Sequence, residues 1–207
     1  MRCPRFLEVM RPMMFLMLVC FLLVPMSMFS MDKEVTLKAK IRQLVELRTA
    51  TINAPNDEMR LAADKEFRTF LEDALMDSKS FSAHFDTIPQ LADLKSGDGF
   101  FRMINWNLPM DDQTHLYRCF IQFYDKKAKS YKVIELKTGY RDVQGENRKV
   151  YSDRDWYGCL YYKIIPSKTR KSGRKRTYML LGWDGHDEYS SIKLLDALTI
   201  TSNNIRF

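Results

Sequence analysis

The chain has 207 residues, with 33 Lys and Arg against 26 Asp and Glu, and a formal net charge of +7. Residues 1–30 hold three of the arginines and one glutamate, so residues 31–207 carry a net charge of +5. So mild a charge affects solubility and does not indicate nucleic acid as a partner. Cys119 and Cys159 are the only cysteines beyond residue 30, which excludes a small protein built around several disulfides.

The first thirty residues have the pattern of an export signal. Three arginines precede an apolar run over residues 13–24, and a polar segment follows it. This order is typical of a secretory signal, and the run is shorter than the about 20 residues of a membrane span. We expect residues 1–30 to be a signal peptide. An uncleaved N-terminal anchor is the alternative, because Met28 is large for a cleavage site at Ser30. Either way, the rest of the chain is expected outside the cytoplasm, in the periplasm, in the cell envelope or secreted.

Residues 31–80 predict a helical hairpin. Apolar residues recur at helical spacing in two stretches, separated by a break at 53–56 in which Asn56 is a candidate N-cap. The first stripe is Leu37, Ile41, Leu44 and Val45, and the second is Met59, Ala63, Phe67, Phe70, Leu71 and Ala74. We assign Arg48 to the polar remainder of the first helix. Both stripes need a partner surface, and packing onto a β domain is favoured over binding of another protein.

Residues 81–99 read as a linker, and residues 100–207 as a β-rich domain. Short alternating runs predict strands at 100–106, 115–124, 131–136, 157–165 and 177–181. Hairpin connections between strands indicate an antiparallel sheet. The expected fold class is therefore α+β, with a helical hairpin followed by an antiparallel sheet and a short helix.

The short helix is predicted from the spacing of Ile192, Leu194, Leu195 and Leu198. After it, Ile200, Ile205 and Phe207 resemble the start of another strand. We therefore expect the β-rich domain to be truncated at its C-terminus and the chain to be a fragment of a longer protein.

A block of cations lies in the loop between the last two predicted strands. Its members are Lys168, Arg170, Lys171, Arg174, Lys175 and Arg176. Outside the cytoplasm, such a loop would attract lipid phosphates or acidic glycans. The alternative is a solvated hairpin tip whose charges prevent edge pairing. No aromatic residue interrupts the block, so base stacking on nucleic acid is not expected.

Aromatic and polar residues alternate at the ends of two predicted strands, in the segments Asn105-Trp106-Asn107 and Leu181-Gly182-Trp183-Asp184-Gly185. Tryptophan beside amide or carboxylate groups suits a sugar ring. The candidate ligand contacts are Asn105, Trp106, Asn107, Trp183 and Asp184. The competing interpretation is structural, with the tryptophans in the core and Asp184-Gly185 forming a turn.

The same two segments resemble parts of an uncharacterised family of exported bacterial proteins. The similarity covers about residues 100–207. It implies export and an extracytoplasmic domain, and it implies no reaction.

Catalytic and metal signatures are weak. His84, His115 and His186 lack the spacing of a zinc site, and we expect no metal and no cofactor. The sequence has no Gly-x-Ser-x-Gly motif. Four carboxylates could supply the pair of a glycosidase, which only their separation in space would define. They are Asp142, Glu146, Asp153 and Asp155.

The two cysteines lie on different predicted strands. Cys119 is expected on an apolar face, and Cys159 on the face opposite to Leu160, Tyr162 and Ile164, which makes a bridge awkward. Taken together, the sequence predicts an exported, non-catalytic binding or structural domain. Its expected partners are a glycan or an anionic envelope lipid, with membrane contact only through an uncleaved leader. A hydrolase of glycans or peptides that uses an Asp/Glu pair is the alternative.

Overall fold

The computed structural model describes residues 28–139, 150–166, 176–201 and 204–207, with side chains from Leu37 onward except that of Arg176. The chain divides into two compact units, Met1–Thr36 and Leu37–Phe207. The predicted leader falls in the first unit, and its residues 1–27 lie outside the described ranges. Among the described residues, neither helix is apolar enough over a sufficient length to cross a membrane.

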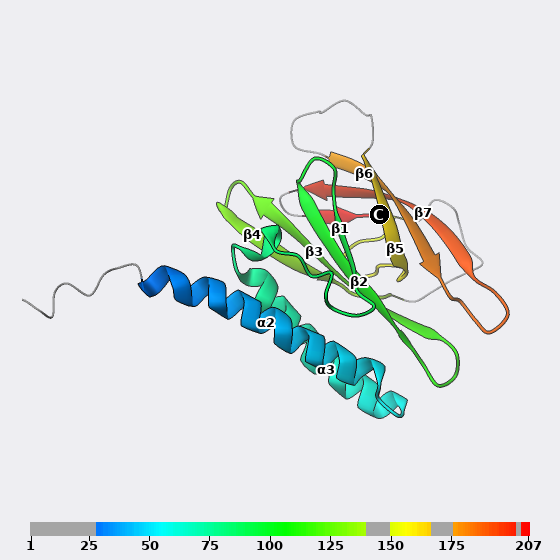
Figure 1. The fold of residues 1–207 in the computed structure, drawn as a ribbon. Helices are drawn as coiled ribbons and strands as arrows, with labels where there is room; N and C mark the ends of the chain where they lie inside the picture. The colour runs from blue at the N-terminus through cyan, green and yellow to red at the C-terminus, as the bar shows by residue number, and fades with distance from the viewer. Residues whose placement is uncertain (1–27, 140–149, 167–175, 202–203) are drawn as a thin grey trace, which may run out of the picture. The chain divides into compact units, whose positions relative to one another are not determined.

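The described residues begin with two helices, α2 (Met28–Ile52) and α3 (Asp57–Met76), and from Leu37 onward α2 runs beside α3 (Figure 1). Asn56 caps α3, because its side-chain oxygen accepts the backbone N–H of Met59 at 2.9 Å. This confirms the predicted N-cap. The exposed pair Lys40–Asp73, at 2.7 Å, joins the two helices.

Within the described residues, the strands form two antiparallel sheets of four strands each. The first sheet has the order β1 (Ala92–Lys95), β2 (Phe101–Pro109), β3 (His115–Asp125) and β4 (Ser130–Leu136). The second has the order β5 (Leu160–Pro166), β6 (Arg176–Asp184), β7 (Ile192–Thr201) and β8 (Asn204–Arg206). Neighbours in the sheets are neighbours in the chain, as hairpin connections require.

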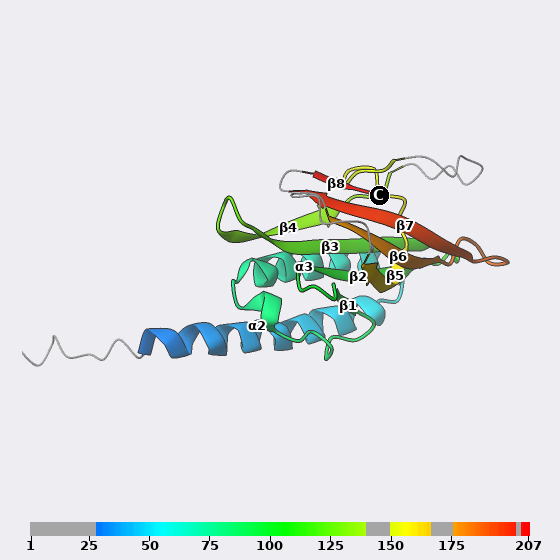
Figure 2. The same ribbon diagram turned by 90° about the horizontal axis from the view of Figure 1, so that it is seen from above.

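The first sheet lies between the helices and the second sheet (Figure 2). Alternation along β2 and β3 sends successive side chains to opposite faces of this sheet. The side facing the second sheet carries Phe101, Met103, Tyr117, Cys119, Ile121 and Phe123. The side facing the helices carries Ile104, Trp106, Leu108 and Phe120, packed against Leu44, Phe67, Leu71 and Ala74. The helical stripes therefore pack on the protein's own sheet.

These observations confirm the α+β class and correct three details. The single expected sheet is two sheets. The region expected as a linker contains a 3₁₀ turn, η1 (Ser80–Ser82), at its start and the edge strand β1. The helix expected around Ile192–Thr201 is strand β7, which pairs with β6 along its length. Pairing with a long neighbour outweighs the helix-like spacing of its leucines.

The expected orientation of Cys159 was also wrong. The register of β5 against β6 shifts between Tyr161 and Lys163, as in a β-bulge. The alternation of buried and exposed side chains therefore fails there, and the Tyr162 side chain, expected to be buried, is exposed. Cys159 and Tyr161 are buried in the same core as Cys119, and both cysteines are free thiols.

Candidate ligand-binding site

The segment Asn105-Trp106-Asn107 on β2 points in two directions. Asn105 is fully buried between the sheets, where its Oδ1 accepts the backbone N–H of Tyr161 at 2.9 Å. Trp106 is fully buried on the opposite face, and its Nε1 donates to Asp64 of α3 at 3.0 Å. Asn105 and Trp106 therefore hold the layers of the molecule together, and neither presents surface to a ligand.

Asn107 is only partly buried and lies at the end of β2. Its Nδ2 is 3.1 Å from Nδ1 of His115, the first residue of β3. In the neutral imidazole the amide donates and Nδ1 accepts, which orients the ring. The His115 ring meets Trp183 of β6 edge to face, with ring centroids 5.5 Å apart. We call Asn107, His115 and Trp183 the aromatic platform.

The glycines of the Leu181-Gly182-Trp183-Asp184-Gly185 segment are explained by close contacts. A Cβ on Gly185 would lie 2.3 Å from His115 Cδ2 and 2.8 Å from an indole carbon of Trp183. A Cβ on Gly182 would lie 2.7 Å from Cys159 Sγ. Gly182 leaves room for Cys159 and for the ring of Tyr161 on the neighbouring strand β5, and Gly185 leaves room for the rings of His115 and Trp183.

Asp184 is fully buried, and its carboxylate accepts hydrogen bonds from Tyr157 and from the loop that follows β6. Its Oδ2 accepts the Tyr157 hydroxyl at 3.0 Å, and its Oδ1 accepts the backbone N–H of His186 at 3.0 Å. The Tyr117 hydroxyl accepts the N–H of Gly185 at 2.7 Å. Of the five predicted contacts, Asn107 and Trp183 both contact His115, and Asp184 is buried.

A second site lies on the helix side of the β2 end. A cavity of about 160 Å³ is lined by Arg48 and Thr51 of α2, Arg60 of α3, and Asn107 and Pro109 of β2. Arg48 is only 1% exposed. Burial is the main cause that lowers its pKa to about 10, so the guanidinium stays charged at neutral pH.

Arg48 donates hydrogen bonds to carbonyl groups, and its guanidinium lies 5.9 Å from the Phe67 ring centroid. Its Nε donates to Pro89 O at 3.3 Å, and its Nη2 donates to Gln90 O at 3.3 Å and Asn107 O at 3.2 Å. Nη1 is buried and has no hydrogen-bond partner among the described residues. The cavity thus has a buried cation whose donors are only partly used.

Arg102 of β2 shows how this protein satisfies a buried arginine elsewhere. It pairs with Asp93 through both Nε and Nη2. Its Nη1 donates to Ser80 O at 2.7 Å, and the guanidinium lies 4.4 Å from the Phe85 ring centroid. Arg48 has no such carboxylate partner in the described part of the chain.

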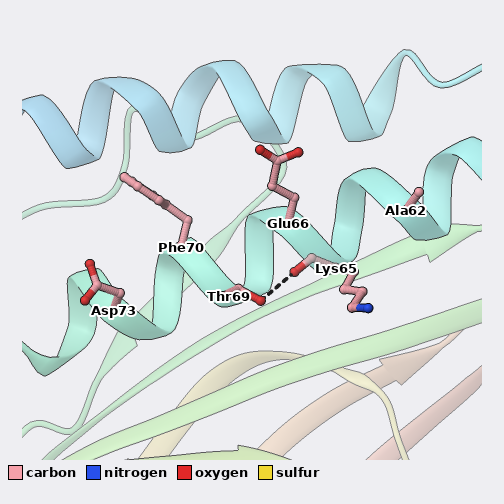
Figure 3. A pocket seen from close by; sticks show the side chains of 6 residues that line it. All are labelled: Ala62, Lys65, Glu66, Thr69, Phe70 and Asp73. Atoms are coloured by element: carbon pink, nitrogen blue, oxygen red, sulfur yellow. Dashed lines mark hydrogen bonds between the residues drawn. The ribbon is translucent and has the colours of Figure 1, made fainter.

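A wide groove of about 440 Å³ runs along α3 and is lined by Ala62, Lys65, Glu66, Thr69, Phe70 and Asp73 (Figure 3). The Glu66 and Phe70 side chains point toward α2, whereas the Lys65 side chain points away from it. Among the residues drawn in Figure 3, the Thr69 hydroxyl donates a hydrogen bond to the Lys65 carbonyl at 3.0 Å. The groove gathers no cluster of groups suited to a specific ligand.

The remaining predicted residues fall outside the described ranges or serve the fold. Lys168 to Lys175 of the basic loop, Asp142 and Glu146 lie outside the described residues, as does the Arg176 side chain. The Asp155 carboxylate accepts the hydroxyl and N–H of Ser152 in a turn. Among described residues, no three His, Cys, Asp or Glu side chains come together as metal ligands do.

Sequence reasoning missed Arg48 as a buried residue, although a signal was present. Arg48 follows Leu44 by four positions and Ile41 by seven, which places it on the apolar face of α2. A charged residue on that face is the signal that could have found the cavity. His115 was weighed only as a metal ligand, and nothing in the sequence places it against Trp183.

In comparisons with known proteins, no family model, no curated protein and no solved structure matches the chain.

Proposed function

We propose that the chain is an exported, non-catalytic binding protein of the cell envelope, and that it holds a glycan at the aromatic platform. The export part depends on the leader pattern of residues 1–30. The observation that supports the glycan is the partly exposed Trp183, whose indole is held by His115, while Asn107 holds His115 in turn.

The chemistry of the platform suits a sugar. An indole face stacks on the C–H face of a pyranose, and the neighbouring imidazole and amide offer groups that pair with hydroxyls. The close approach of Gly185 and the hydrogen bond from Asn107 restrict the rings before the ligand arrives, which lowers the entropy lost on binding. The basic loop, with Lys168 and Arg170 among its cations, is a secondary contact for acidic glycans or anionic lipid.

The test is a binding panel of immobilised glycans and vesicles of anionic lipid, run beside an assay for release of hydrolysis products. We expect a glycan to bind, and Trp183→Ala to weaken binding at least about tenfold, the equivalent of about 1.4 kcal/mol. Gly185→Ala should also weaken it, because the new methyl group displaces both rings. Tyr124→Ala is the matched control, since Tyr124 is an exposed aromatic residue at the other end of β3.

Two results would contradict this proposal. One is the absence of glycan binding, or an equal loss in Trp183→Ala and Tyr124→Ala, with both variants folded by circular dichroism. The other is product release that a single carboxylate substitution abolishes, which would favour the hydrolase alternative.

A further inference from the structure

The cavity at Arg48 is lined by a buried guanidinium that donates no hydrogen bond to a carboxylate of the described residues. A guanidinium removed from water costs several kcal/mol unless a carboxylate or another anion pairs with it. Asp64 is the carboxylate whose field raises the Arg48 pKa, but it is engaged elsewhere. Its oxygens accept Trp106 Nε1 at 3.0 Å and Arg118 Nε at 2.9 Å.

The second arginine of the cavity is already paired with carboxylates. Arg60 has carboxylate partners, Asp57 and Asp111, but these two residues do not line the cavity. No acidic side chain is among the lining residues. An anion in the cavity would therefore pair with Arg48, whose Nη1 has no partner among the described residues, and not with Arg60.

The backbone around Arg48 is shaped to hold the guanidinium in place. Gln90, whose carbonyl accepts Nη2, has φ 49°, a left-handed conformation that residues with side chains rarely adopt. With Nε and Nη2 occupied by carbonyls, the donors left over are the two N–H bonds of Nη1. The arginine is thus fixed in position with one donor group unused.

We infer that the Arg48 cavity is a binding site for a small oxyanion, a carboxylate or phosphate group, which accepts from Nη1 and balances the buried charge. At about 160 Å³ the cavity is smaller than the about 300–1,000 Å³ of ordinary ligand sites, so the bound group is small. Pro109 and Gln90 are exposed residues of its lining and mark its side toward solvent.

This site goes beyond the proposed glycan contact. Only Asn107 belongs to both, with its side chain in the platform and its backbone carbonyl on Arg48. The two functions are therefore separable by mutation. Trp183→Ala should leave oxyanion binding unchanged, and Arg48→Met should leave glycan binding unchanged.

The test uses the full chain in a mild non-ionic detergent at constant ionic strength. Inorganic phosphate, sulfate and acetate are titrated separately against chloride, and binding is followed by calorimetry and by the midpoint of thermal unfolding. At least one oxyanion should bind saturably and raise the midpoint as its concentration rises. Stronger binding of acetate would identify a carboxylate ligand, and stronger binding of phosphate or sulfate a tetrahedral one.

Arg48→Met should lower the affinity for the oxyanion at least about tenfold, because the charge and the Nη1 donors are lost. Arg42→Met is the matched control, since Arg42 is an exposed arginine on the same helix. The affinity of this variant for the oxyanion should equal that of the wild type. If Arg48→Met does not fold, Pro109→Glu places a competing carboxylate at the solvent side and should weaken binding likewise. The inference is overturned if no oxyanion binds saturably, or if the affinity is the same with and without the Arg48 guanidinium.

Discussion

Asp196 is a carboxyl group on the inward face of β7, where the Tyr161 hydroxyl donates to it. The Tyr161 oxygen also accepts the indole N–H of Trp156 at 3.1 Å. Burial raises the pKa of Asp196, and the hydrogen bond from Tyr161 opposes this only in part. Burial likewise raises the pKa of Tyr161, which keeps it a neutral donor. The charged form of the Asp196 carboxyl group is therefore disfavoured by folding at neutral pH.

From this we predict that Asp196→Asn increases the free energy of unfolding at about pH 7 and not at about pH 3. The folded pKa of Asp196 lies above its unfolded value, so the folded protein binds the proton more tightly. Wild-type stability from this group is fully present below the unfolded pKa, and it is lost as the pH rises through the folded pKa. The Asn oxygen still accepts the Tyr161 hydroxyl, but it carries no charge. Urea denaturation of both proteins across this pH range measures the difference.

Asp187→Asn is the control for this prediction, because its expected sign is opposite. Asp187 is exposed, and its pKa is lowered by hydrogen bonds from Tyr189 N–H and then Ser190. The stability that Asp187 contributes is present above its unfolded pKa and lost as the pH falls. Equal pH profiles for Asp196→Asn and the wild type would disprove the role assigned to Asp196.

At the residue scale, sequence reasoning found polar groups but misjudged their surroundings. Asn107 and Trp183 are predicted from two short segments at strand ends, and in the structure each contacts His115. Arg48 and Asp64 occupy apolar helix faces, where their spacing from Leu44 and Phe67 could have placed them. Asn105 and Trp106 were named as contacts because polar and aromatic residues alternate there. Alternation alone does not tell which face of a strand is covered by another layer.

Among the elements, α3 is held on the first sheet by one buried carboxylate. Asp64 accepts the Trp106 indole of β2 and the Arg118 guanidinium of β3, and it lies 3.2 Å from Arg68 Nε. The Phe67 ring packs edge to face on Trp106, with centroids 5.1 Å apart. One helix position therefore joins both central strands of the sheet.

We predict that Asp64→Ala lowers the free energy of unfolding by about 3–5 kcal/mol, because it leaves a buried N–H and a partly buried guanidinium without their acceptor. Asp73→Ala on the same helix should cost less than about 1 kcal/mol, because the Asp73 side chain is 64% exposed and pairs with Lys40 at the surface. Guanidinium denaturation of the two variants measures both values. Equal losses would mean that the Asp64 contacts do not hold α3 in place.

Element prediction succeeded where the hydrophobic period was long and failed where pairing decided the structure. The helix stripes at Leu44 and Phe67 and the alternation of β3 extend over several turns or many residues. β1 has only four residues, and its conformation depends on its pairing with β2. In β7, Ile192, Leu195 and Leu198 also fit a helix spacing, and pairing with β6 makes the segment a strand.

At the scale of the whole molecule, β2 and β3 contribute to two cores at once. Their residues on one side pack on the helices and those on the other side pack on the second sheet. Cys119 of β3 and Cys159, the residue before β5, lie in the same core between the sheets. Exposure of either thiol therefore requires this core to open.

We predict that Cys119 and Cys159 do not react with a thiol reagent in the native protein and that both become reactive in one step on unfolding. Burial raises the pKa of both thiols, so the reactive thiolate is rare as well as inaccessible. Labelling at increasing denaturant, followed by peptide mass spectrometry, separates these two sites from Cys3 and Cys20. A Tyr189→Cys variant gives the rate for an exposed thiol, because Tyr189 is 90% exposed. Early labelling of Cys159 alone would show that the second sheet opens while the first remains folded, and that the core between the sheets is not one cooperative unit.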